Sequence, residues 1–405
     1  MTAALILGVS AGQDRLQFHP FERPSEFPDR SIAWVAALDP AMHRPFLDAA
    51  PRLIAEMPRG LRALTVLVPR LAPPTHGARH DGMASSFVCS AGLFRSLLRG
   101  QPPSPPAPLT FALLYAIMNG RLSARRVAVR QLPLKEESPS PAGKPLPVSL
   151  IMAHRGTVRH LDRALDYIAK AAQAKMKVRV GLDLDAIDRY GRLMARFPDV
   201  QFFRISQAPA GPYVIRQLLV DHGREPLIAF HDSDDISCFD RFTALTREMS
   251  ATGCDLIGCH ELRFHELDRE VTILRFPVDA SSSLRAAPNH VMLHPSSMIG
   301  RAAFHAAGGF STDRKIANDT QFLLRACFNI RIRNIDGFYY IRRKHPAALT
   351  VAPETCLDHP VRAELLRVWH RDFTEIKHGR MALADSSLRA IPSERDHRLI
   401  RVPRR

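Results

Sequence analysis

Short apolar runs alternate with amphipathic stretches over residues 147–230, and this alternation predicts repeated strand–helix units. Expected strands occupy residues 148–153, 178–182, 200–205 and 226–230. Between them, apolar residues recur at helical spacing over 158–172, 187–197 and 214–220. Strands that alternate with helices in this way favour right-handed βαβ units. The pattern therefore predicts an α/β fold with a doubly wound, mostly parallel sheet flanked by helices.

The pattern before residue 132 is weaker and predicts only a small α/β region without an assigned role. Its expected strands lie at 32–38 and 64–69, and its expected helices at 46–57, 91–98 and 111–118. The stretch at 133–147 is rich in proline, which is typical of an extended linker. The expected parts of the chain are therefore the N-terminal α/β region 1–132, the linker 133–147, the main domain 148–355, and a C-terminal helical extension with a basic, solvated tail at 356–405.

Composition adds a strong positive charge to this picture. The 405 residues carry a formal net charge of +16, and the pI is about 10.2. Basic and aromatic residues are not interleaved as in nucleic-acid-binding proteins, so we expect no nucleic-acid partner. The charge would instead suit peripheral association with an anionic inner membrane surface.

Two further features of the sequence bear on location. No apolar run approaches the length of a membrane span, and the N-terminal segment lacks the charged region of a signal peptide. The scattered cysteines form no C-x-x-C pair and fit a reducing compartment. We therefore expect a cytoplasmic protein, and the sequence leaves its oligomeric state open.

The most informative motif is HDSDD at residues 231–235, which directly follows the expected strand at 226–230. Asp232 and Asp234 lie two positions apart and would face the same way along an extended backbone. Carboxylates held side by side repel each other, and a hard divalent cation that carries diphosphate oxygens relieves this repulsion. Because ligands bind at the carboxyl edge of open α/β sheets, the motif indicates a metal–nucleotide site. An acidic turn after a strand is the alternative.

A second pair of acids, Asp183 and Asp185, follows the expected strand at 178–182. Parallel strands bring their carboxyl ends to one edge of a sheet, so we expect these acids on the same edge as Asp232. A carboxylate there can accept hydrogen bonds from hydroxyls or from an imide N–H. The sequence does not distinguish the two acids, because Asp185 could equally cap the next helix.

Residues of about 147–350 resemble a family 2 glycosyltransferase of the GT-A fold. The matching features, in the family's order, are PVSLIMA at the first strand, LDRAL (161–165), GLDLD (181–185), DSDD (232–235), GGF (308–310), ANDTQFLLR (317–325) and RRKHPAALT (342–350). Each feature is weak alone, but the ordered set covers roughly half of the chain. The resemblance implies a GT-A type sheet that binds a nucleotide-sugar donor.

The resemblance also implies roles at the donor site. Asp234 would ligate Mg²⁺ or Mn²⁺, and Asp232 would contact the ribose, the metal or its bound water. His345 would be a metal ligand or a contact of the leaving group, the alternative being a basic surface loop. The remaining donor contacts that it implies are Arg155, Arg343 and either Asp183 or Asp185.

Asp319 occupies the position of the family's catalytic base, near the start of the helix expected at 317–325. Asn318 stands where the family usually has a first acid. An acid at a helix N-terminus is also favoured by the helix dipole alone, which is the alternative for Asp319. Arg325 matches an arginine of the same motif and could equally be a structural partner.

Together these features predict a metal-dependent, inverting glycosyltransferase. Its expected donor is a UDP-sugar, and its acceptor is a hydroxyl group of a saccharide, a lipid-linked saccharide or a protein. Synthesis of a surface polysaccharide or glycoconjugate is the expected setting. The alternatives are a nucleotidyltransferase, which shares the sheet and the acidic metal ligands, and a non-catalytic glycosyltransferase-like binding module.

Overall fold

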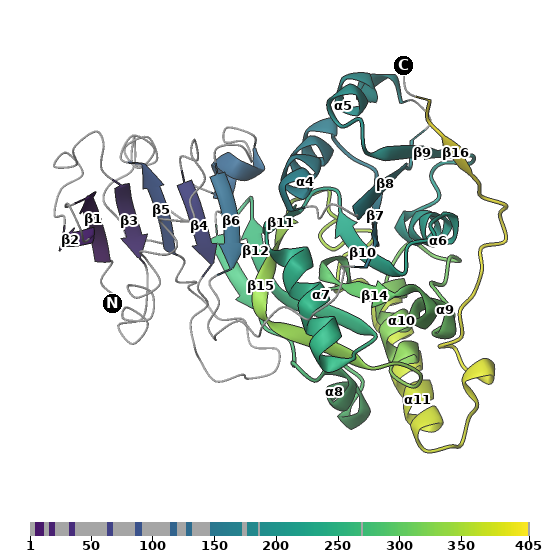
Figure 1. Cartoon of the computed structure of the whole chain (residues 1–405). Coiled ribbons are helices and arrows are strands. Elements are labelled where there is room, and N and C mark those ends of the chain that lie inside the picture. The colour runs from purple at the N-terminus through teal and green to yellow at the C-terminus, as the bar shows by residue number, and fades with distance from the viewer. Residues whose placement is uncertain are drawn as a thin grey trace.

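The computed structural model describes residues 5–11, 16–20, 32–36, 63–67, 86–90, 114–119, 127–131, 146–171, 176–184, 187–268 and 270–403. Two sheets organise these residues (Figure 1). The candidate site lies in the larger sheet. The helices expected at 46–57 and 91–98, most of the linker and Asp185 lie outside the described residues.

Parallel strands form the centre of the larger sheet, whose order is β11-β15-β12-β14-β10-β7-β8-β9-β16. Parallel pairing joins β10 (Leu227–Asp232), β7 (Val148–His154), β8 (Met176–Leu182) and β9 (Gln201–Ile205). Each of these overlaps one of the strands expected between residues 148 and 230. The predicted α/β class with a mostly parallel central sheet is therefore confirmed.

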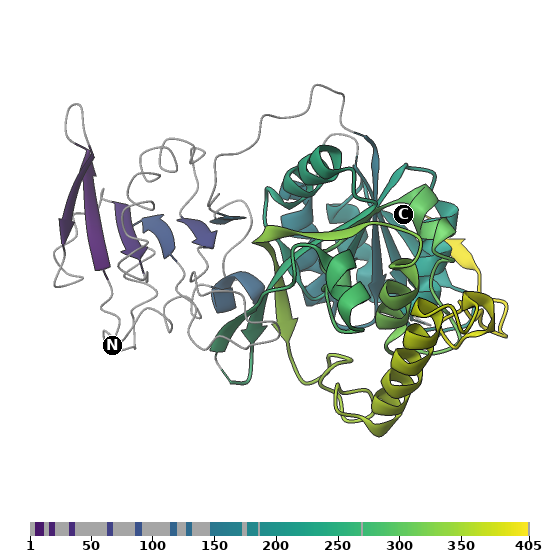
Figure 2. The same cartoon turned by 90° about the horizontal axis from the view of Figure 1, so that it is seen from below.

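Helices cover both faces of this sheet (Figure 2). On β7, Leu150 and Met152 face one hydrophobic core while Ile151 faces the other, because successive side chains of a strand point in opposite directions. The first core includes α4 (Val158–Ala171), α5 (Gly191–Arg196) and α7 (Arg241–Thr252). The second includes α6 (Pro212–His222), α9 (Arg301–Ala306), α10 (Asn318–Ala326) and α11 (Pro360–Lys377).

The other half of the sheet contains strands that the hydrophobic pattern did not predict. A short strand, β14 (Met298–Gly300), runs antiparallel between β10 and β12 (Leu256–His265). Next to β12 lies the parallel strand β15 (Ile332–Lys344), and the remaining strands here are β11 (Ile236–Ser237) and β13 (Glu270–Leu274). The shorter helical elements are α8 (Ala280–Ala286), η2 (Asp188–Tyr190), η3 (His294–Ser296) and η4 (Leu383–Asp385).

The C-terminal segment packs on the main domain up to residue 402, while Arg401 is exposed and the solvation of the basic tail stays a prediction. Strand β16 (Leu399–Arg401) pairs antiparallel with β9, and the Val402 N–H donates to the Phe202 carbonyl at 2.9 Å. Arg325 is buried and donates to the carbonyls of Ala307 and Leu388 at 2.6 and 2.7 Å. Arg325 therefore contacts backbone carbonyls and helps to hold the C-terminal segment against α10.

The smaller sheet belongs to the N-terminal region. Its order is β2-β1-β3-β5-β4-β6, and its strands are β1 (Leu5–Ala11), β2 (Leu16–Pro20), β3 (Ile32–Ala36), β4 (Ala63–Leu67), β5 (Ser86–Ser90) and β6 (Val127–Gln131). The strands expected at 32–38 and 64–69 are confirmed by β3 and β4, and residues 114–118 are helical within the helix expected at 111–118. The Tyr115 ring lies 6.4 Å from the ring of Phe264 on β12.

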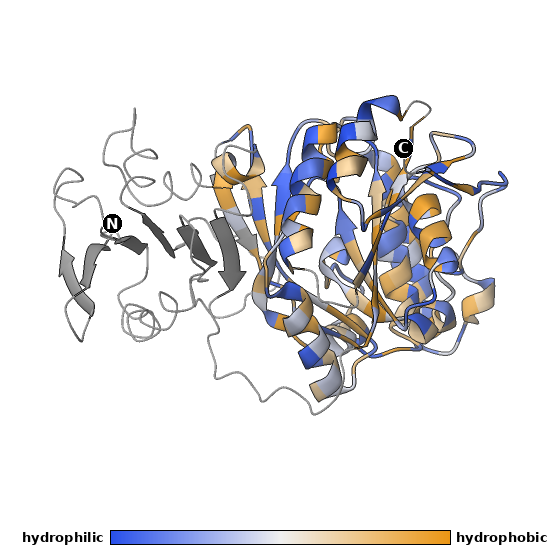
Figure 3. Ribbon diagram, turned by 45° about the horizontal axis from the view of Figure 1, so that its top comes forward, coloured by the Kyte–Doolittle hydropathy of each residue, from blue (hydrophilic) through white to orange (hydrophobic). Residues whose placement is uncertain are grey.

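Hydropathy follows the layers of the main domain. In Figure 3 the apolar residues concentrate on the inner strands and on the helix sides that face the sheet, in agreement with the buried residues of the two cores. Among the described residues, no helix combines the length and the apolar character needed to cross a membrane.

Candidate functional site

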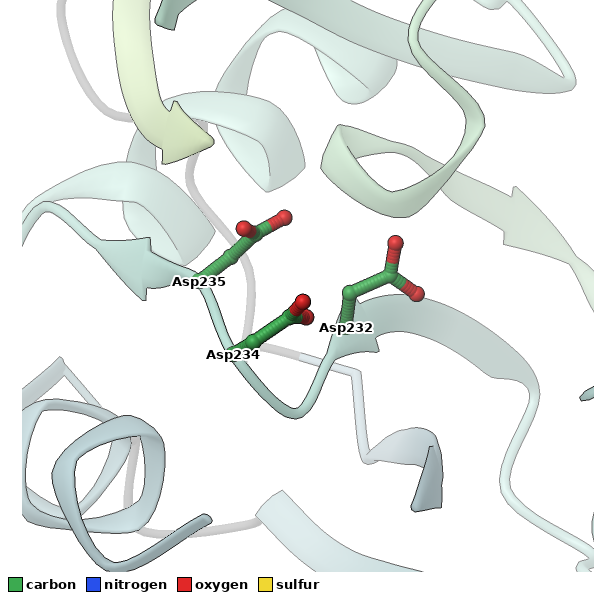
Figure 4. Close-up of side chains that lie close together, drawn as sticks. All are labelled: Asp232, Asp234 and Asp235. Carbon is green, nitrogen blue, oxygen red and sulfur yellow. The ribbon is translucent and has the colours of Figure 1, made fainter. Parts of the chain in front are cut away.

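The acidic loop formed by residues 232–235 (the acid loop) connects β10 to β11 at the carboxyl edge of the parallel strands. The loop turns tightly, and the Asp235 N–H donates to the Asp232 carbonyl at 3.3 Å. One carboxylate oxygen from each of Asp232, Asp234 and Asp235 lies within 4.8 Å of the others (Figure 4). The structure thus brings Asp232 and Asp234 together and adds a third carboxylate to the pair.

Two of these carboxylates are partly exposed and have basic partners. Asp232 forms an ion pair with Arg216 of α6, and its N–H donates to the Tyr340 hydroxyl at 3.0 Å. The Oδ2 of Asp234 lies 2.8 Å from Nε2 of His345. Burial alone would raise the pKa of Asp234, but the contact with His345, together with the nearby His160 and a backbone hydrogen bond, lowers it. The acid loop is therefore held from α6 on one side and from the end of β15 on the other.

Asp235 is buried and only partly satisfied. Its Oδ1 accepts the Arg343 N–H at 2.7 Å, whereas its Oδ2 has no hydrogen-bond partner among the described residues. Burial and the negative charges of Asp234 and Asp232 raise the pKa of this carboxyl well above its usual value. An unpartnered carboxylate oxygen beside two further carboxylates offers the hard ligands that divalent cations prefer. These residues therefore fit Mg²⁺ or Mn²⁺.

A basic group adjoins the Asp234 side of the acid loop. Nη1 of Arg343 lies 2.5 Å from Nε2 of His160 and 3.8 Å from the carboxylate of Glu266. The rings of His160 and His345 are in edge contact, with centroids 5.1 Å apart. Burial and the charge of Arg343 lower the pKa of His160 to about 4, so at neutral pH its Nε2 can accept a hydrogen bond from the guanidinium. Arg343 and His345 thus both contact His160 on this side of the acid loop.

His154, at the end of β7, joins the acid loop to the neighbouring loop. Its Nδ1 lies 2.8 Å from the Ser233 hydroxyl and its Nε2 lies 2.9 Å from the Tyr190 hydroxyl. Burial lowers the pKa of His154 to about 4, so the ring is neutral at pH 7 and carries one proton. Because the Tyr190 hydroxyl donates to the Gly156 carbonyl at 3.2 Å, the arrangement favours the proton on Nε2 and Ser233 as donor to Nδ1.

The residues expected to contact the nucleoside and diphosphate from the first loops have different surroundings. Asp183 is buried, and its two oxygens accept the N–H groups of Ala210 and Gly211 at 2.7 and 3.0 Å. This carboxylate therefore fixes the loop that precedes α6, and a nucleoside contact stays a prediction. Arg155 is exposed in the loop after β7, and Asp185 lies outside the described residues.

Asp319 lies in the first turn of α10, half-buried and close to polar groups of other elements. The Tyr213 hydroxyl donates to its carboxylate. Burial alone would raise the pKa of Asp319, but His294, His290, Tyr213 and Arg216 together hold it below the usual value. Asp319 is therefore ionised at neutral pH, which is the state that a general base needs.

Helix α6 connects the acid loop with Asp319. Tyr213 and Arg216 lie three positions apart and share one side of the helix, and the guanidinium lies 5.2 Å from the centroid of the Tyr213 ring. Arg216 pairs with Asp232, while Tyr213 contacts Asp319. Sequence analysis missed both residues. The only available signal was a tyrosine and an arginine at i, i+3 in an otherwise apolar helix, which is too common to select them.

No protein-family model and no curated protein matches this chain. Solved structures of S. aureus TarS are similar at low identity. TarS 1–349 in complex with UDP-GlcNAc is 13% identical with a TM-score of 0.43, and the match covers 59% of this chain and 74% of that chain. For TarS 1–349 with UDP the identity is 16%, the TM-score 0.41, and the coverage 59% and 74%. For a longer TarS structure the identity is 14%, the TM-score 0.42, and the coverage 57% and 44%. Similarity at this level assigns the chain to no family.

Proposed function

We propose that this protein is a metal-dependent glycosyltransferase that moves a sugar from a nucleotide-sugar to a hydroxyl group of an acceptor. One observation carries the proposal: α6 contacts the acid loop through Arg216 and contacts Asp319 through Tyr213. A carboxylate cluster suited to a cation and a separate ionised carboxylate are thereby held by one helix. These are the two parts that a sugar transfer from a diphosphate needs, namely a site for the leaving group and a base for the acceptor.

Asp319 is the proposed base. As the acceptor oxygen forms a bond to the anomeric carbon, its proton passes to the Asp319 carboxylate. The bond between that carbon and the diphosphate oxygen breaks on the opposite side, and its electron pair leaves with the nucleoside diphosphate. Attack from the side opposite to the leaving group inverts the configuration of the sugar carbon.

The acid loop and the basic group beside it form the proposed leaving-group site. Mg²⁺ or Mn²⁺ held by Asp234 and Asp232, with His345, would offset the negative charge of the diphosphate. Arg343 and the exposed Arg155 carry fixed positive charge that supports the same role. Asp183 or Asp185 remains the proposed nucleoside contact.

The resemblance of the motifs to family 2 glycosyltransferases supports UDP as the nucleotide of the donor. The proposed acceptor is a hydroxyl group of a surface polysaccharide, a lipid-linked saccharide or a protein. The net charge of +16 supports work at the cytoplasmic face of an anionic membrane.

Binding of UDP with Mn²⁺ tests the donor site directly. We expect UDP to raise the melting temperature only when Mn²⁺ is present, because a ligand that binds the native state stabilises it by about 2.7 kcal/mol at one hundred times its Kd. Asp234→Ala should abolish this shift, since it removes the carboxylate that faces His345. Differential scanning fluorimetry with and without each ligand measures both effects.

Asp199→Ala is the matched control, because Asp199 is an exposed acid in the turn between α5 and β9. It should leave the shift with UDP and Mn²⁺ unchanged. Stabilisation by UTP but not by UDP would favour a nucleotidyltransferase instead. No stabilisation by any nucleotide in a folded sample would favour the non-catalytic binding module.

A further inference from the structure

A compact cationic cluster lies on β12 and β15, outside the contacts assigned above. The strands pair in register, with Glu261 opposite Tyr340 and Arg263 opposite Arg342. Lys344 lies two positions beyond Arg342 and therefore shares its face of β15. Like charges directly opposite each other destabilise a sheet unless another group offsets them. The position of two arginines in register therefore requires an explanation.

Glu261 supplies part of this explanation. It is fully buried, and its carboxylate accepts from Arg263 at 2.7 and 2.9 Å and from Arg342 at 3.1 Å. Burial alone would raise the pKa of Glu261, but Arg342 and Arg263 lower it to about 2, so it is ionised at neutral pH. One carboxylate is present for two arginines and the nearby Lys344. Among the described residues, no other carboxylate forms a hydrogen bond with the cluster, although Asp235 and Asp232 lie within electrostatic range of Arg342. The direct contacts of the cluster therefore leave an excess of positive charge.

The remaining hydrogen-bond donors of the cluster are arranged around Thr350. The Thr350 hydroxyl oxygen accepts from Arg342 at 3.1 Å and from Lys344 Nζ at 3.1 Å. With both contacts made to its oxygen, the hydroxyl keeps its own proton to donate elsewhere. Lys344 has further ammonium protons, and the side chains of Arg263 and Arg342 remain 14% and 16% exposed. A small oxyanion could thus receive several charge-assisted hydrogen bonds here.

This cluster and the basic group beside Asp234 lie on opposite faces of β15. Arg343 alternates with Arg342 and Lys344 along the strand, and its side chain contacts His160 and Glu266 instead. The cluster lies between the acid loop and Asp319. Asp235 is within electrostatic range of Arg342 and Lys344, and His290 is within range of Asp319 and also of Arg342 and Arg263. An anion in the cluster would therefore lie between the acid loop and the proposed base.

We infer that Arg263, Arg342, Lys344 and Thr350 form an oxyanion site that binds a phosphate or carboxylate group of the acceptor. The inference rests on the proposed function for the identity of the ligand as an acceptor, but the anion site itself can be tested separately. It implies that the protein elongates or modifies an acidic acceptor and discriminates against a neutral one.

Inorganic phosphate is a suitable probe, measured by isothermal titration calorimetry on the full chain with and without saturating UDP and Mn²⁺. We expect phosphate to bind in both conditions, because the acceptor site and the diphosphate site are distinct. Lys344→Gln should weaken phosphate binding by about tenfold, the effect of losing one hydrogen bond to a charged group. This variant keeps both arginine contacts of Glu261 and so preserves the buried ion pairs. Arg263→Gln should weaken binding at least as much.

Arg192→Gln, at an exposed position of α5, is the control and should bind phosphate like the native protein. Loss of phosphate binding when UDP and Mn²⁺ are added would overturn the inference, since it would assign the cluster to the donor diphosphate. Equal phosphate binding by Lys344→Gln, Arg263→Gln and the native protein would overturn it as well. Phosphate binding that depends on Lys344, in a protein that never binds UDP, would instead retain the anion site and contradict the proposed function.

Discussion

Replacing Asp319 by asparagine is expected to lower the turnover of sugar transfer by about 10²- to 10⁴-fold, the usual contribution of a general base. Asparagine has nearly the same shape but cannot take the acceptor's proton. Its side-chain oxygen can still accept the Thr320 N–H, which Asp319 binds at 2.9 Å, so the start of α10 should be preserved. The contact with Tyr213 can also persist, because an amide oxygen accepts from a hydroxyl.

The measurement is the initial rate of nucleoside diphosphate release with a UDP-sugar and an acceptor, together with UDP binding in the presence of Mn²⁺. We expect the rate to fall while UDP binding stays unchanged, because Asp319 lies on α10 and not in the acid loop. Asp313→Asn, a change of the same type at an exposed position shortly before α10, is the control and should keep the native rate. A native rate in Asp319→Asn would remove Asp319 from the mechanism and leave it as a helix N-terminal acid.

The parallel half of the main sheet could be predicted because its signal is local. Strands β7 and β10 are covered by helices on both sides, so they read as nearly continuous apolar runs, as in Leu150, Ile151 and Met152 of β7. In β8 the apolar residues alternate with Lys177 and Arg179. The helices between them carry one apolar side each. A short window of sequence therefore contains the whole signal, and the predicted ranges overlap the observed strands.

The other half could not be predicted because its polar residues are satisfied across strands. Glu261 and Arg263 on β12, and Arg342 on β15, interrupt the apolar pattern that marks a buried strand. They are tolerated because Glu261 pairs with Arg263 two positions away and with Arg342 on the neighbouring strand, 81 positions away. No local window shows the pairing with Arg342. The short antiparallel strand β14 could not be predicted from the local pattern either, because it is defined only by its pairing with β10 and β12.

In the candidate site, too, some residues have a local sequence signal and others are recognised only from contacts in the folded protein. Asp232 and Asp234 could be located from sequence because they directly follow an apolar run. Their partners Arg216 and His345 come from other elements, and only the fold brings them together. The motif resemblance placed His345 in the right region, whereas nothing in the sequence distinguished Arg216 from an ordinary helix arginine.

His294 is expected to lower the stability of the folded protein in acid. Its ring is 1% exposed, and neither ring nitrogen has a hydrogen-bond partner among the described residues. The ring lies between aromatic side chains, with centroids 4.3 Å from Phe230 and 5.0 Å from Phe310. Burial, together with the charge of Arg216, lowers the pKa of His294 to about 3 from a usual value of 6.5. The folded protein therefore keeps this imidazole neutral well below neutral pH.

The sign of the resulting pH dependence follows from proton binding. Below pH 6.5 the unfolded chain protonates this histidine while the folded protein does not, so acid favours unfolding. The free energy of unfolding should therefore fall by about 1.4 kcal/mol for each pH unit between about 6 and 4 from this residue alone. His294→Leu removes the titrating ring and should make the fall shallower by that amount. At pH 7 the exchange should change stability by less than about 1.5 kcal/mol, since leucine is of similar size and leaves no unpartnered nitrogen.

Urea denaturation at several pH values between 7 and 4, for the native protein and His294→Leu, measures the two slopes. His305→Leu, at an exposed position of α9, is the matched control. The difference between the native and His294→Leu curves reports the titration of His294 together with its electrostatic interaction with Asp319, because all other titrating groups are common to both. Parallel curves would mean that His294 gains a proton or a partner in the folded state, and therefore that its ring is not enclosed by the aromatic side chains of Phe230 and Phe310. A fall toward acid that is steeper for the native protein than for His294→Leu would instead establish that the folded protein keeps this imidazole neutral and buried.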